Sequence, residues 1–80
     1  MDINIVYNEM IEKLKASNSL DVISALENSA AGAATGSEAL MSTGFYLSSL
    51  KQNNHLVYEL IKEQIKEYLK YCKQNGLIIK

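Results

Sequence analysis

The feature that most constrains this chain is a stretch from Ala30 to Leu50 in which only one residue, Glu38, is charged. The other residues of the stretch are small, apolar or hydroxylated, whereas charged residues are frequent on both sides of it. Ala and Gly dominate residues 30–36, which indicates a tight junction, and the residues from Ser37 to about Gln52 favour a helix. We therefore expect that helix to be interior and covered by the charged flanks.

The length of the chain, 80 residues, predicts a single helical domain covering residues 1–80. A domain of this size buries a modest share of its surface, so its stability is small without further contacts. Proline is absent, and glycine occurs only at positions 32, 36, 44 and 76, which allows long uninterrupted helices. No internal repeat, low-complexity tail or linker divides the sequence.

Apolar residues recur with helical spacing in four segments of the chain. The predicted helices cover residues 3–16, 20–29, 37–52 and 55–75. The predicted fold class is all-α, a small compact bundle of four helices in which the central helix 37–52 is the most buried. Because helix 20–29 is short and its apolar stripe is narrow, three helices and a turn form the alternative.

Capping signals mark the ends of these helices. The predicted N-caps, in chain order, are Asp2, Asn18 or Ser19, Thr35 or Ser37, and Asn53 or Asn54. Thr35 followed by Glu38 also matches the spacing of a capping box. At the end of the last helix, Gly76 fits a left-handed stop, with Leu77 packed back toward Cys72.

The spacing i, i+3, i+4, i+7 predicts which face of each helix is buried. In the first two helices this face contains Ile3, Tyr7, Met10, Ile11 and Leu14, followed by Val22, Ile23, Leu26 and Ala30. In the last two it contains Leu40, Thr43, Leu47 and Leu50, followed by Val57, Leu60, Ile61, Ile65, Tyr68, Leu69 and Cys72. Phe45 and Tyr46 point to different sides of their helix, so at least one of them is peripheral.

Three features leave alternatives open. Gly44 and Ser48 belong to a stripe of small residues, which favours close helix packing over a ligand groove. Gln64 lies within the apolar face of the last helix, where it either bonds a buried backbone group or marks an opening toward a partner. Residues 77–80 pack on the core or add to a partner as an edge strand, and the core is favoured.

Residues that carry enzyme chemistry are too few for a catalytic site. Cys72 is the only cysteine and falls on a predicted inner face, where a thiol behaves as a small apolar group. His55, the only histidine, is expected at the surface. Backbone N–H groups after Gly36 offer an alternative anion site, but Glu38 stands where the anion would bind. We predict no enzyme activity, no catalytic residue, no metal and no cofactor.

Charge and hydropathy argue against nucleic acid and membrane partners. The formal net charge is −1 and arginine is absent, so phosphate recognition is weak. A helix-turn-helix regulator built on helices 20–29 and 37–52 is the least favoured hypothesis, because Glu38 lies in its recognition helix. No apolar run approaches the roughly 18 residues of a membrane helix, and no secretion signal is visible at the N-terminus. We expect a cytoplasmic protein, and the frequent Lys, Asn, Ile and Tyr fit a low-GC bacterium.

The most specific functional signal is a small set of apolar side chains that the helical pattern places outside the core. These candidate interface residues are Ile5, Tyr46 and Leu56, with Tyr58 at the edge. Aromatic and aliphatic anchors of this kind are typical of protein interfaces. The general features of the chain are shared by bacterial immunity and antitoxin-like inhibitors and by phage accessory proteins. We predict a non-enzymatic protein-binding module, an inhibitor or immunity-type binder of one bacterial protein. A homo-oligomer is the alternative, and no small-molecule substrate is expected.

Overall fold

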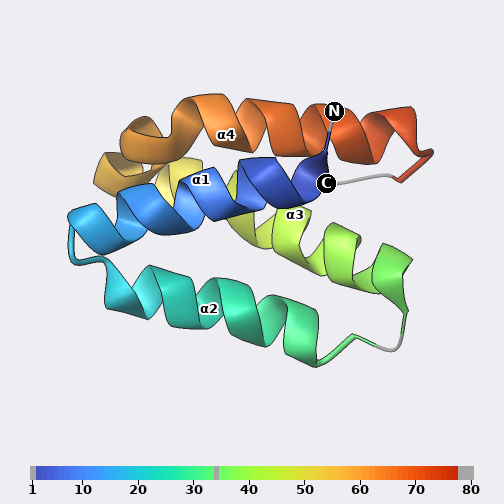
Figure 1. The fold of residues 1–80 in the computed structure, drawn as a ribbon, viewed down its shortest axis with the longest axis horizontal. Coiled ribbons are helices and arrows are strands. Elements are labelled where there is room, and N and C mark those ends of the chain that lie inside the picture. The colour runs from blue at the N-terminus through green and yellow to red at the C-terminus, as the bar shows by residue number, and fades with distance from the viewer. Residues whose placement is uncertain (1, 34, 78–80) are drawn as a thin grey trace.

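The computed structural model describes residues 2–33 and 35–77, which form an antiparallel bundle of four helices (Figure 1). The helices are α1 (Ile3–Ala16), α2 (Leu20–Ala31), α3 (Gly36–Asn53) and α4 (His55–Gln74). Each of α1 and α3 packs against both α2 and α4. The predicted all-α bundle is confirmed, and every predicted helix boundary lies within two residues of the observed one.

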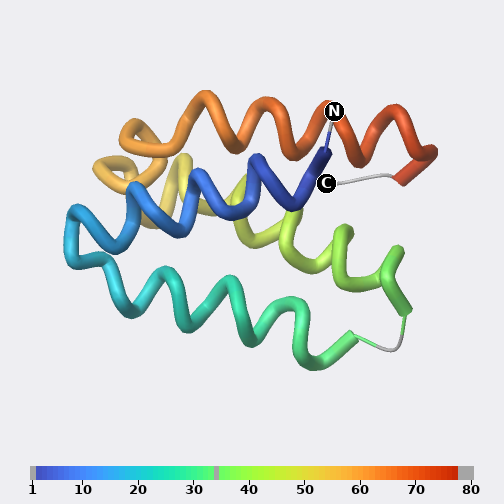
Figure 2. The backbone as a smooth tube through the Cα atoms, viewed as in Figure 1, coloured from blue at the N-terminus to red at the C-terminus, as the bar shows by residue number. Residues whose placement is uncertain are grey.

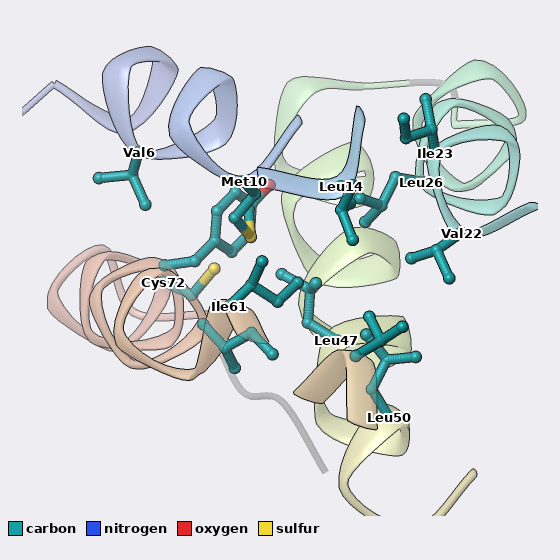
Figure 3. Packing of buried hydrophobic residues seen from close by; sticks show 13 residues of the cluster. Val6, Met10, Leu14, Val22, Ile23, Leu26, Leu47, Leu50, Ile61 and Cys72 are labelled. Carbon is teal, nitrogen blue, oxygen red and sulfur yellow. The ribbon is translucent and has the colours of Figure 1, made fainter. Parts of the chain in front are cut away.

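The core lies between the helices, and among the described residues 13 buried apolar side chains from all four helices form it (Figure 3). Met10, Leu14, Leu26, Leu47 and Ile61 are completely buried. Burial of this kind is what holds short helices together, because their intrinsic propensity is marginal in water.

The buried face of α1 is rotated from the predicted one. Val6 is buried, whereas Ile3, Tyr7 and Ile11 are half-buried and pack at the edge of the core. In α2, Ala30 is exposed although the spacing placed it on the inner face. Like the other helices, α1 and α2 each pack against two neighbouring helices, and the direction of those contacts, which the spacing within one helix does not give, decides which side chains are covered.

Buried residues are distributed more evenly among the helices than the sequence predicts, and α3 is not the most buried helix. It contributes four buried residues, and α4 contributes five. Leu47 and Leu50 are buried as predicted, but Leu40 is half-buried and Phe45 is 59% exposed. Like every helix of the bundle, α3 packs against two neighbours, so one side of it stays open. Gly44 is buried within this helix, as the close-packing alternative requires.

Most of the predicted caps are confirmed. The side chains of Asp2, Thr35 and Asn54 accept hydrogen bonds from backbone N–H groups of the first turns that follow them, at 2.9, 3.1 and 3.4 Å. Gly76 adopts a φ of 75°, and Leu77 N–H donates to the Cys72 carbonyl at 2.9 Å. Leu77 is half-buried against the core, whereas residues 78–80 of the predicted tail lie outside the described residues.

The turn between α1 and α2 depends on Asn18, which has a φ of 59°. The backbone N–H groups of Asn18 and Ser19 donate to the carbonyls of Lys15 and Leu14, at 3.0 and 2.8 Å. These are the two bonds of a Schellman motif, so Asn18 ends α1 and is not the cap of α2. Ser19 is the N-cap of α2, but its side chain makes no capping bond.

Replacement of Asn18 by Ala is expected to lower the free energy of unfolding by about 1 kcal/mol, because an alanine Cβ disfavours the left-handed conformation. Asn18→Gly is expected to be neutral or slightly stabilising, since glycine adopts a positive φ without steric cost. Urea denaturation measures both changes. Asn28→Ala, at an exposed position inside α2, is the control and is expected to stabilise by a few tenths of a kcal/mol. A glycine variant less stable than the alanine variant at position 18 would contradict this account.

Candidate functional site

A sharp corner joins α3 to α4. Asn54 alone, with φ −151° and ψ 76°, ends α3 and caps α4. Seven residues later the backbone of Ile61 departs from helical geometry, with φ −116° and ψ 19°, so α4 is kinked there. The first turns of α4 therefore form a separate short segment, after which the helix runs back along α3 (Figure 2). The kink also accounts for Leu60, which the unbroken helical spacing placed on the inner face but which is partly exposed.

This corner and the turn between α1 and α2 together surround a shallow depression of about 380 Å³, which we call the corner surface. It is lined by Ser17, Ser19, Asn54, Leu56, Val57 and Leu60. The Leu56 side chain is 85% exposed, the largest value among the big apolar side chains that the structure describes. Val57, the next residue, is buried in the core and so fixes the backbone that carries Leu56.

Lysines lie near the corner surface in the helix ends that meet there. The last turns of α1 and α3 contain Lys13, Lys15 and Lys51, and the first turn of α2 contains Asp21. Lys13 Nζ donates a hydrogen bond to Gln64 Oε1 at 3.2 Å, which ties α1 to α4. That bond answers the question about Gln64: its partner is a side chain of α1 and not a buried backbone group.

The first two turns of α4 hold a second small polar cluster. His55 Nε2 lies 3.5 Å from Glu59 Oε1, and its ring stacks on Tyr58 with the centroids 6.5 Å apart. The imidazole is exposed, as the sequence predicts. These contacts stay on one helix and leave the apolar side chain of Leu56 uncovered.

The four predicted interface residues do not form one surface. Leu56 and Ile5 are exposed, but Ile5 stands in a separate groove on α1 beside Asn8 and Glu9. It is about 18 Å along the helix axis from the corner surface, at 1.5 Å per residue. Tyr46 is half-buried and packs against the core, so its predicted outward position is wrong, whereas Tyr58, predicted at the edge, is half-buried there.

Two neighbours mark the position of the Tyr46 side chain: the core, and Asp21 of α2. Burial raises the pKa of its hydroxyl, and the nearby carboxylate of Asp21 on α2 raises it further. Tyr46 therefore lies toward α2, and Phe45, one residue earlier on α3, takes the outward position instead. Leu20, also exposed, was missed because it precedes the apolar stripe of α2. Helical spacing alone does not indicate which of the two side chains, Phe45 or Tyr46, is covered.

The single thiol is protected from reaction. Cys72 is completely buried, and its Sγ donates a weak hydrogen bond to the Leu40 carbonyl at 3.8 Å. Burial raises the pKa of this thiol, which lowers the fraction of the reactive thiolate. Among residues 2–33 and 35–77, no three His, Cys, Asp or Glu side chains come together as a metal site would require.

The remaining observations concern the chain as a whole. No helix in the described part of the chain combines the length and the apolarity needed to cross a membrane. A scan of protein-family models and searches of curated proteins and of solved structures found no match to this sequence. The corner surface is therefore interpreted from its own geometry and chemistry.

Proposed function

We propose that this protein is a non-enzymatic binding module that docks one partner protein through the corner surface. The observation that carries the proposal is Leu56, a large apolar side chain 85% exposed within a depression that two turns surround. Burial of one leucine side chain in a partner is worth about 1.5–3 kcal/mol. A few well-buried side chains carry most of the binding energy of many protein interfaces.

The corner surface is suited to binding because its backbone is already fixed. The Asn54 side chain caps the segment that carries Leu56, and Val57 and Ile61 hold the same segment to the core. Association therefore costs little ordering of the main chain, which leaves more of the contact energy for affinity.

The charged residues around the corner surface indicate which kind of partner would fit it. Lys15 and Lys51 lie in the helix ends that meet beside the corner surface, and the nearby acids are Asp21 in the first turn of α2 and Glu59 near the start of α4. A partner with an apolar socket bordered by carboxylates fits this arrangement, and opposite charges speed its association. Two copies of the chain placed face to face would bring like charges together, which disfavours a homodimer through this surface.

An inhibitor of one bacterial protein is the specific form that we propose, since a small rigid domain can act by occupying a functional surface of its partner. The sequence is rich in Lys, Asn, Ile and Tyr, which supports a bacterial origin. Its single cysteine cannot form an intramolecular disulfide, which supports a location in the reducing cytoplasm. A DNA-binding role is less well supported, because Lys51 is the only cation of α3 and arginine is absent.

Replacement of Leu56 by Ser is expected to reduce recovery of the partner about tenfold or more, because it removes the apolar anchor. The experiment is affinity capture from a bacterial lysate on immobilised protein, with quantitative mass spectrometry and titration of the recovered partner. Phe45→Ser, at another exposed apolar position on the open side of α3, is the control and is expected to change nothing. Lys51→Glu is expected to slow association several-fold at low salt.

Two results would contradict the proposal. One is unchanged partner recovery by Leu56→Ser, and the other is an equal loss with Phe45→Ser. Light scattering over a concentration series tests the homo-oligomer alternative, because the proposal requires a species of 8.9 kDa throughout. A dimer that Leu56→Ser dissociates would replace the partner protein with a second copy of the chain.

A further inference from the structure

A pocket of about 280 Å³ lies at the end of the bundle opposite the corner surface. Its walls come from all four helices and include Tyr7, Ala30, Gly36, Ala39, Thr43 and Tyr68. In Figure 1 this is the end at which α1 begins, α2 ends and α3 begins.

The pocket exists because the junction between α2 and α3 offers only small side chains to cover it. Ala30 and Ala39 line it with single methyl groups, and Gly36 contributes none. Apart from Gly36 itself, its chain neighbours and the adjoining backbone of α3, no described heavy atom lies within 4 Å of the place that a Cβ on Gly36 would occupy. Larger residues at these positions would fill the space, as they do in the closely packed middle of the bundle.

Two buried hydroxyl groups face one another at the base of the pocket. Thr43 and Tyr68 are 2% and 4% exposed, and their side chains are hydrogen-bonded to each other. Tyr7, half-buried, lies near them on α1. Burial raises the pKa of Tyr68 to about 12 and also raises that of Tyr7, so both phenols keep their protons at neutral pH. The base of the pocket therefore offers neutral hydroxyl groups inside an otherwise apolar wall.

We propose that this pocket binds a small neutral molecule with an apolar ring body and one hydrogen-bonding group. Its described lining contains no Lys, Asp or Glu, so a charged ligand would lose hydration without gaining a partner. An apolar cleft with a few convergent polar groups is the usual form of a small-molecule site. Its volume lies near the lower end of the range for such sites, roughly 300–1,000 Å³, which favours a ligand of one or two rings.

The pocket and the corner surface are separate sites, because the helices place them at opposite ends of the bundle. The sequence predicts no small-molecule ligand, since the lining residues are scattered over four helices and include no recognised motif. A ligand here would contact the first turns of α1 and α3 together with α4. Because it would bind the folded state and not the unfolded one, it would stabilise the folded state by mass action.

Indole is a suitable probe, because it is neutral, has two fused rings and carries one N–H group. We expect titration with indole to about 5 mM to give saturable backbone amide shifts in ¹H–¹⁵N spectra that cluster around the pocket. Ala39→Leu fills the pocket and is expected to weaken binding about tenfold or more. Ala16→Leu, the same substitution at the exposed far end of α1, is the control and is expected to bind like the wild type.

A second variant keeps the test decisive if Ala39→Leu disturbs the fold. Ala30→Leu fills the pocket from an exposed position on α2 and is expected to weaken indole binding to a similar degree. Indole-3-carboxylate, which adds a negative charge, is expected to bind at least about fivefold more weakly than indole. The proposal is overturned by shifts that do not saturate, by equal affinity in the wild type and both filled variants, or by equal affinity for the two probes.

Discussion

Replacement of Leu47 by Ala is expected to lower the free energy of unfolding by about 3–4 kcal/mol. The Leu47 side chain is completely buried and lies among core residues of the other helices, including Ile61 of α4 (Figure 3). Its removal loses the transfer free energy of the buried groups and leaves a cavity that the helices only partly close. A domain of 80 residues has a total stability of roughly 4–12 kcal/mol, so this variant is expected to be only marginally folded.

Urea denaturation followed by circular dichroism measures this loss, and two variants serve as controls. Leu56→Ala removes the same atoms from a side chain that is 85% exposed, and it is expected to change stability by less than about 0.5 kcal/mol. Leu47→Met nearly conserves the volume and is expected to cost less than about 1.5 kcal/mol. If Leu47→Ala were as stable as Leu56→Ala, the assignment of Leu47 to the centre of the core would be incorrect.

The parts of the fold that were predictable from the sequence depend on contacts close in the chain. The spacing of Ile61, Ile65 and Cys72 marks one face of a helix, whatever that face packs against. Caps such as Asp2 and Thr35 act on backbone groups within three residues, so their identity and position are enough to predict them. The helix boundaries followed from the same local rules.

The parts that were not predictable depend on where the helices lie relative to one another. Tyr46 and Phe45 look alike by spacing, and only the presence of α2 beside α3 decides which one is covered. The kink at Ile61 has no proline or glycine at or next to it, so the sequence gives no local signal for it. Asn18 seemed a cap for the next helix, whereas its left-handed backbone ends the preceding one.

The two candidate sites were also predictable from the sequence only in part. The exposed position of Leu56 follows from the helical pattern, but the depression around it requires the α1–α2 turn to lie beside the start of α4. The pocket at the other end combines residues as distant in the chain as Tyr7 and Tyr68. Small residues such as Ala30 and Ala39 carry little pattern of their own, and the space they leave is visible only in the folded protein.

Tyr68 is expected to make the stability fall as the pH rises from about 10 to 12. Burial raises the pKa of its hydroxyl to about 12, against about 10 in the unfolded chain. In this range the unfolded protein releases the phenol proton while the folded protein still holds it, so deprotonation favours unfolding. The contribution is fully present below pH 10 and amounts to about 2–3 kcal/mol, of which roughly half is lost by pH 11.

The difference between wild type and Tyr68→Phe isolates this effect, because other groups titrate equally in both proteins. Near pH 8 the variant is expected to be less stable by about 1 kcal/mol, since Thr43 loses its buried hydrogen-bond partner. Near pH 11 that penalty is expected to vanish, because only the wild type carries the titrating hydroxyl. Thr43→Val breaks the same hydrogen bond but keeps the phenol, so its penalty is expected to persist or grow with pH. A Tyr68→Phe penalty that stays constant from pH 8 to 11 in urea denaturation would show that the phenol is not held in its protonated form by burial.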